Sequence, residues 1–155
     1  MPLKDTFSRL KVRSLIAKAV IRPFEPQDHA EVVSLWKDVF SDDPPWNEPS
    51  AVIRRKLTVQ PELFLVAHVD GRLVATVLAG FDGVRGWIHH LAVRPSHRRL
   101  GIARALMVVV EEGLAKLGCP KVNLQVRATN AAVMSFYRAL GYSIEERASL
   151  GKRLG

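Results

Sequence analysis

The order of β-rich and helical periodicity in the middle of this sequence constrains its fold more than any other feature. Residues 62–83 contain two β-rich runs around Asp70-Gly71, a dipeptide typical of a tight hairpin turn. Residues 87–93 form a third β-rich run, and residues 101–118 then repeat apolar side chains at helical spacing. This order predicts an antiparallel meander followed by one long amphipathic helix.

A further β-rich run follows that helix and defines the topology. The helix is predicted to end at Gly118, shortly before Pro120, and residues 121–126 again favour a strand. A strand, a crossover helix and a second strand normally form a parallel pair with a right-handed connection. We therefore expect residues 87–93 and 121–126 to be parallel neighbours in a mixed sheet.

The remaining segments complete an α/β fold with helices on the faces of that sheet. The other predicted elements are a strand over 19–24, helices over 27–40, 50–60 and 130–141, and one or two closing strands over 142–154. The core-facing stripe expected for the helix over 27–40 is Ala30, Val33, Trp36, Val39 and Phe40. Ser50 is the expected N-terminal cap of the next helix. The predicted order is β-α-α-β-β-β-α-β-α-β(β).

Composition bounds the class of protein. A chain of 155 residues is long enough for one domain, which we place at residues 19–155 after a basic extension over 1–18. No apolar run approaches the roughly 20 residues of a membrane-spanning helix, so no membrane association is expected. The single Cys119 cannot form a disulfide within the chain, and this favours a cytoplasmic location.

A basic turn at residues 98–103 (RRLGIA) opens the long helix directly after the third β-rich run. Helix N-termini have unpaired N–H groups and partial positive charge, and both favour phosphate binding. Gly101 allows a ligand to approach the backbone, Ala103 leaves space, and Arg98 and Arg99 add charge. The alternative is a surface loop that happens to contain arginines, but the flanking strand and helix favour a phosphate site.

Two motifs resemble those of the GNAT superfamily of N-acetyltransferases. The R-x-x-G-x-A pattern at 98–103 is similar to its acyl-CoA pyrophosphate loop, and NAAVMSFYRALGY at 130–142 is similar to its second signature. The resemblance extends over about residues 20–150, with Leu100 and Ala103 as departures from the commoner loop residues. The strings WNEP and SLGKRL further resemble a small bacterial subgroup whose substrates are largely unassigned.

This resemblance implies the GNAT fold, acetyl-CoA as acyl donor, and direct acetyl transfer to a primary amine without a covalent enzyme intermediate. The residues it assigns to acetyl-CoA binding are Leu91, Ala92, Val93, Arg98, Arg99, Leu100, Gly101, Ile102, Ala103 and Asn130. It assigns Tyr137 the role of general acid that protonates the departing thiolate. The alternative for Tyr137 is an aromatic side chain packed on an amphipathic helix.

The acceptor amine must lose a proton to a base or a water chain. Two strand positions that supply this group in some relatives correspond here to Trp87, which cannot accept a proton, and His89, which can. We therefore predict His89 as the base, and the alternative for either histidine is a side chain that is only packed or solvated. His90 should point to the opposite face of the strand, unless a bulge intervenes.

The acceptor side is expected within residues 41–60, where acidic residues surround an aromatic one. Asp42, Asp43 and Glu48 around Trp46 are candidates for a mouth that binds a cationic amine, or else form a solvated acidic loop. Phe81 and Asp82 are further substrate candidates. No metal is expected.

Other functional classes stay open at this level. The net charge of +8 prompts a nucleic-acid-binding reading, but aromatic residues make up only 7% of the chain and fall in predicted core stripes. A catalytically silent acyl-CoA-binding module is the second alternative, because position 87 lacks a carboxylate. The acceptor is either a small amine or a peptide or protein amine, and a homodimer is possible by analogy with relatives.

Overall fold

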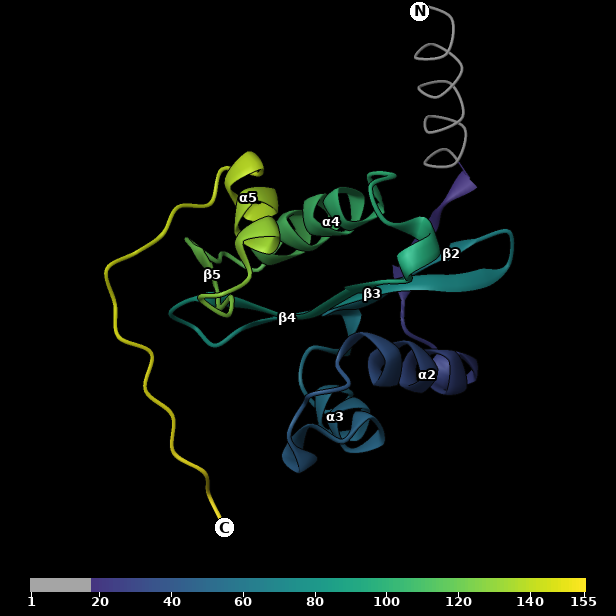
Figure 1. The fold of residues 1–155 in the computed structure, drawn as a ribbon, viewed down its shortest axis with the longest axis horizontal. Coiled ribbons are helices and arrows are strands. Elements are labelled where there is room, and N and C mark those ends of the chain that lie inside the picture. Colours follow the sequence, from purple (N-terminus) through teal and green to yellow (C-terminus); the bar gives the residue numbers. More distant parts are fainter. Residues whose placement is uncertain (1–17) are drawn as a thin grey trace, which may run out of the picture. The chain divides into compact units, whose positions relative to one another are not determined.

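Five strands form one mixed sheet in the order β1-β2-β3-β4-β5 (Figure 1). Their bounds are Val20–Pro23, Phe64–Val69, Arg72–Phe81, Gly86–Val93 and Val122–Leu124. Neighbours from β1 to β4 are antiparallel, and β4 and β5 are parallel. The predicted meander and the predicted parallel crossover are both confirmed.

The computed structural model describes residues 18–155, so most of the basic extension expected over 1–18 lies outside the described residues. The chain divides into a first unit that ends at Leu124 and a second unit, Gln125–Gly155. The helices of the first unit are α2 (His29–Val39), α3 (Pro49–Lys56) and α4 (Ile102–Lys116). In Figure 1, α2 and α3 lie on one side of the sheet and α4 on the other. None of the described helices is long and apolar enough to cross a membrane.

The hairpin between β2 and β3 has the predicted two-residue turn. Asp70 and Gly71 both adopt positive φ angles, 50° and 75°, as the tight turn that matches strand twist requires. The turn places the apolar residues of both strands in the core. Every residue of β2 except His68 is buried, and so are the seven residues of β3 from Leu73 to Ala79. Local turn chemistry thus determines the register of the central hairpin.

The buried face of α2 differs from the predicted stripe. Val32, Leu35 and Trp36 are buried, whereas Ala30 is exposed. Of the predicted stripe, Trp36 is buried, and Val33, Val39 and Phe40 are partly buried and pack against the core. The prediction is therefore wrong for Ala30, and it omitted Val32, Leu35 and Asp28, a charged residue that is only 2% exposed and has no apolar signature.

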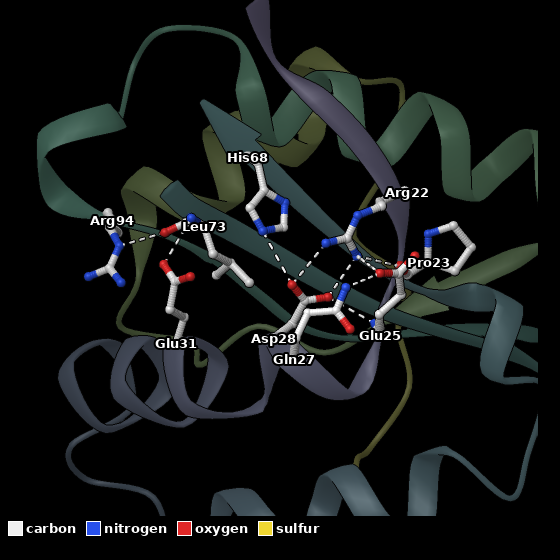
Figure 2. Close-up of polar contacts among 9 residues, drawn as sticks. All are labelled: Arg22, Pro23, Glu25, Gln27, Asp28, Glu31, His68, Leu73 and Arg94. Carbon is white, nitrogen blue, oxygen red and sulfur yellow. Dashed lines mark hydrogen bonds and ion pairs between the residues drawn. The ribbon is translucent and has the colours of Figure 1, made fainter. Parts of the chain in front are cut away.

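Asp28 is buried because a set of polar contacts compensates its charge (Figure 2). Both nitrogens of the Arg22 guanidinium donate to its carboxylate, at 2.7 and 2.9 Å, and the backbone N–H of Glu25 donates at 2.8 Å. His68 on β2 lies 3.3 Å away. Burial raises the pKa of Asp28, but the bonds from Arg22 and Glu25 and the charges of Arg22 and His68 outweigh it, so the pKa is lowered. The network joins β1, β2 and the start of α2.

A second contact in Figure 2 joins α2 to the chain segment after β4. The backbone N–H of Leu73 donates to the Glu31 carboxylate at 3.0 Å. The carbonyl of the same residue accepts from Arg94 Nε at 2.7 Å. The backbone of Leu73 on β3 therefore bonds both to α2, through Glu31, and to Arg94, the residue that follows β4.

Helix α3 begins differently from the prediction. Its N-cap is Glu48, whose carboxylate accepts from the backbone N–H groups of Ser50 and Ala51, at 3.0 and 2.8 Å. Ser50 itself lies inside the helix, so the expected serine cap is wrong. Pro49 at the first helical position has no N–H, and the side chain before it reaches the next two donors.

The closing strands expected over residues 142–154 do not form. The second unit contains helix α5 (Ala131–Ala139), and no strand occurs in residues 143–155. Ile144, Leu150 and Leu154 are 65%, 94% and 89% exposed. A strand is stabilised by its partner and by a continuous apolar face, and the charged run over 145–147 interrupts that face.

Candidate active site

A β-bulge in β4 is the feature around which the candidate site is built. Thr76 of β3 lies opposite Ala92, and Leu78 lies opposite His89. The single residue between them on β3, Val77, therefore faces two residues of β4, His90 and Leu91. His90 has a positive φ of 49°. The bulge turns the His90 side chain, so that both His89 and His90 line one pocket.

The buried hydroxyl of Thr76 secures the bulge. It accepts a hydrogen bond from Trp36 Nε1 at 2.8 Å and donates to the carbonyl oxygen of His90 at 3.0 Å. Thr76 and Trp36 are 0% and 1% exposed. Sequence reasoning did not single out Thr76, although a hydroxyl in the middle of an apolar strand always needs a buried partner.

The pocket has a volume of about 500 Å³ and lies beside the bulge. Its walls come from α3 and the following turn, the end of β3, and β4. Of the predicted site residues, His89, Phe81 and Asp82 line it. Arg55, Lys56 and Gln60, which sequence reasoning did not single out, line it as well.

The two histidines differ in their surroundings. His89 is open to the solvent, and its pKa is lowered first by partial desolvation and then by the charge of Lys56. His90 packs against Trp36 and Phe40, with ring centroids 4.5 and 5.1 Å away. Burial lowers the pKa of His90 to about 4, although Asp43 opposes the shift. Both imidazoles are therefore neutral near pH 7, and His89 is the one that a substrate can reach.

Lys56 and Gln60 fasten the turn after α3 to the end of β3. Lys56 Nζ donates to the carbonyls of Val59, Gln60 and Ala79, at 2.7, 3.1 and 2.6 Å. Burial lowers the pKa of this ammonium group. The Gln60 side-chain amide donates to the Phe81 carbonyl and accepts from the Phe81 N–H, at 2.9 and 2.7 Å. The floor of the pocket is thus held by backbone carbonyls and one amide side chain.

The acidic residues near the pocket are engaged in local contacts. The Glu48 carboxylate caps α3, and Asp82 accepts from the N–H groups of Val84 and Arg85 at 2.8 Å each. These backbone bonds lower the pKa of both carboxyl groups. The Asp43 carboxylate lies 4.0 Å from His90 Nε2.

Trp46 lies outside the pocket wall, while its neighbour Asn47 is part of it. The Trp46 side chain is 51% exposed, and its carbonyl accepts from a guanidinium nitrogen of Arg55 at 3.0 Å. Asp42 is exposed. The structure therefore places only part of the expected acidic and aromatic mouth at the pocket.

The second half of β4 has an open edge. β5 pairs only with Gly86, Trp87 and Ile88, so within the described sheet no strand pairs with Leu91 to Val93 on that side. The backbone there can hydrogen-bond an extended ligand, as a free strand edge does. This is the segment expected to bind the pantetheine arm.

The basic loop leads from β4 into α4. Arg98 Nε donates to the Val93 carbonyl at 3.1 Å, and Arg99 and Gly101 adopt positive φ angles of 61° and 83°. Gly101 is the N-cap of α4 and offers no side-chain acceptor. Across residues 18–155, no protein acceptor meets the N–H groups of Ile102 to Arg104, the first residues of α4. Such a helix start is suited to bind a phosphate group.

The second unit holds the other two predicted residues. Asn130 is the N-cap of α5, where its side-chain oxygen accepts from the Val133 N–H at 3.3 Å. Tyr137 is 8% exposed and packs between Phe136 and Tyr142, with centroid distances of 5.0 and 5.6 Å. Burial raises the pKa of Tyr137 to about 12, so its hydroxyl keeps its proton at neutral pH.

Comparison with known proteins gives consistent matches. Residues 29–142 match the family model described as the acetyltransferase (GNAT) family. The chain is similar to an acetyltransferase of Yersinia pestis (strain Pestoides F), with 45% identity over 136 residues that cover 86% of this chain and 94% of that protein.

Solved structures share the fold. Ard1 from Thermoplasma volcanium superposes with a TM-score of 0.73 at 26% identity, covering 83% of this chain and 84% of that one. AAC(6')-Iy, solved in complex with the bisubstrate analogue CoA-S-monomethyl-acetylneamine, also has a TM-score of 0.73, at 18% identity and with coverage of 88% and 99%. The second likeness concerns the fold alone.

Proposed function

Because this chain belongs to the acetyltransferase (GNAT) family, we propose that it transfers an acetyl group from acetyl-CoA directly to a primary amine. The observation that carries the proposal is the open edge of β4, which leads from the bulge at His90 to the uncapped start of α4. A donor with an extended arm and a pyrophosphate fits this sequence of features. The complex of AAC(6')-Iy with a CoA analogue supports such a donor on this fold.

Each part of the donor has a matching part of the chain. The N–H groups from Arg99 to Ala103 bind the pyrophosphate, with the partial positive charge of the α4 N-terminus behind them. The backbone of Leu91 to Val93 bonds the pantetheine amides along the open edge. Backbone donors at the bulge polarise the thioester carbonyl as negative charge develops on its oxygen.

Two side chains move protons in this proposal. His89 takes a proton from the attacking amine, since it is open to the pocket and neutral near pH 7. The amine nitrogen bonds to the carbonyl carbon, and the carbon–sulfur bond then breaks. The motif at residues 130–142 assigns the proton of the departing thiolate to Tyr137, and burial, which raises the pKa of this hydroxyl to about 12, keeps it protonated at neutral pH.

The donor site is tested by thermal unfolding with and without acetyl-CoA. A ligand that binds only the folded state raises the midpoint by several degrees at concentrations about 100-fold above its Kd. Gly101→Glu places a side chain and a negative charge at the α4 start and should abolish the rise. Gly83→Glu is the matched control, because Gly83 also has a positive φ, 93°, and lies in an exposed turn.

Turnover is then measured with primary amines, as release of free thiol and as the mass of the acetylated amine. A midpoint rise that is lost in Gly101→Glu and kept in Gly83→Glu, together with thiol release, is the expected result. No rise in the unaltered protein, or an equal rise in Gly101→Glu, contradicts the proposed donor site. Binding without turnover of any amine would identify a silent acyl-CoA-binding module.

A further inference from the structure

We propose that the acceptor is a small amine that also carries a carboxylate, and that Arg55 binds this carboxylate. The inference rests on the proposed N-acetyltransferase function and names its acceptor class. It follows from the charges that line the pocket, from the contacts of Arg55, and from the size of the pocket.

The pocket has a basic lining. Its titratable lining residues are Arg55, Lys56, His89, His90 and Asp82. Asp82 is the one acid among these lining residues, and two backbone N–H groups of its own turn already bond its side chain. A polyamine or another multiply charged cation would therefore meet two fixed positive charges and one engaged carboxylate. The lining favours a ligand with a negative group.

Lys56 contributes charge to the pocket but no hydrogen bond to a ligand. Its three ammonium hydrogens have three carbonyl acceptors, from Val59, Gln60 and Ala79. Glu62, whose charge acts on Lys56, is not part of the pocket wall. The ammonium group is therefore a fixed positive charge beneath the pocket. Such a charge favours the neutral form of a nearby amine, which is the form that attacks an acyl group.

Arg55 provides the hydrogen-bond donors that Lys56 lacks. It lies in the last turn of α3, and one guanidinium nitrogen donates to the Trp46 carbonyl at 3.0 Å. That bond holds the side chain at the pocket wall. Within residues 18–155, the Trp46 carbonyl is the acceptor found for this guanidinium, and its other N–H groups face no protein acceptor. The planar fork of an arginine binds a carboxylate through two parallel bonds, so the free edge is suited to one.

The size of the pocket agrees with a small acceptor. Its volume of about 500 Å³ lies within the range typical of small-molecule sites. Phe81 and Trp87 line it beside the polar groups and offer apolar surface to the body of such a ligand. The amine would then lie near His89, with the carboxylate at Arg55.

The test is a panel of amino acids, each paired with the amine that lacks only the carboxylate, such as phenylalanine with phenethylamine. Initial rates of acetylation are measured for the unaltered protein and for Arg55→Gln, Arg55→Lys and Arg54→Gln. Arg54 is the matched control, because it is an exposed arginine of α3, as Arg55 is, but does not line the pocket. Acetyl-CoA binding by each variant is checked through the thermal midpoint.

We expect kcat/KM to favour the carboxylate-bearing member of the best pair by about 10- to 100-fold, the range for charge-assisted bonds to a guanidinium. Arg55→Gln should remove this preference, mainly by raising KM for the amino acid, and should leave kcat/KM for the amine without the carboxylate unchanged. Arg55→Lys should keep part of the preference, and Arg54→Gln should keep all of it.

Two results overturn the inference and leave N-acetyl transfer standing. One is faster acetylation of the amines that lack the carboxylate. The other is an equal fall in kcat/KM for both members of a pair in the Arg55→Gln variant. Acetylation of no member, although acetyl-CoA raises the midpoint, instead refutes transfer to small amines and the acceptor inference together.

Discussion

The hydroxyl of Thr76 is the contact whose removal tests the architecture of the site most directly. Thr76→Val keeps the shape of the side chain and deletes only the hydroxyl. The change leaves the Trp36 indole N–H and the His90 carbonyl without their partner. The bulge then has no side-chain bond from β3, and the buried indole has no acceptor.

The expected cost follows from these two groups. An unsatisfied buried polar group costs about 1–3 kcal/mol. The Trp36 side chain is 1% exposed and should incur a cost within this range, whereas the His90 carbonyl lies in a partly buried region and regains some hydration. The sum is about 2–3 kcal/mol of unfolding free energy, which corresponds to a fall in Tm of roughly 4–12 °C for a chain of this size.

Urea unfolding followed by tryptophan fluorescence measures this cost. Thr58→Val is the matched control, because the Thr58 hydroxyl also donates to a carbonyl, that of Arg55 at 2.7 Å, but at an exposed position. Water replaces that bond, so the control should change the unfolding free energy by less than about 0.5 kcal/mol. A Thr76→Val cost no larger than that of Thr58→Val would refute the reasoning.

A double-mutant cycle isolates the bond between the two side chains. Trp36→Phe removes the donor and part of the ring, and Thr76→Val then no longer leaves an indole N–H unsatisfied. The double variant should therefore cost less than the sum of the single variants, by about 1 kcal/mol. Full additivity would show that the two side chains are not coupled.

Two further predictions concern titratable groups. His89→Gln should lower kcat/KM by about 100-fold. It should also remove the acid limb of the pH–rate profile, whose midpoint in the unaltered enzyme lies below 6.5 because desolvation and Lys56 lower the His89 pKa. An unchanged pH profile would exclude His89 as the base. Asp28→Asn should lower the unfolding free energy at pH 7 by about 3 kcal/mol, because it breaks a buried pair with Arg22. The Asp28 pKa is lowered on folding, so its contribution is present above the ordinary value of 3.8 and is lost as the pH falls through the folded value. Unfolding measured from pH 7 to pH 2 should therefore show the two proteins converging in acid, and a constant difference would contradict the assignment.

The regular elements could be predicted because their signals are local. The Asp70-Gly71 turn, the helical spacing over 101–118 and the stop at Gly118 each depend on a few neighbouring residues. From the order of these elements, the expected topology is an antiparallel meander followed by a parallel crossover, and the structure has this topology. The closing strands failed because a strand depends on a partner as much as on its own residues.

The candidate site depended on contacts between residues distant in sequence. The bulge at His90 is not visible in the string WIHHLAV, because both histidines suit a regular strand equally well. It is secured by Thr76 on another strand and Trp36 on α2. Lys56 and Arg55 reach the pocket only because the turn after α3 is bonded to the end of β3.

By itself, then, the sequence determined the order of the elements up to α5, the crossover and the basic loop at the start of α4, since backbone propensity and spacing act over a few residues. Only the tertiary structure decided the burial of Asp28 and the placement of both histidines on one pocket. A buried carboxylate or hydroxyl, such as those of Asp28 and Thr76, finds partners on other elements of the fold, and no local pattern encodes where those partners lie.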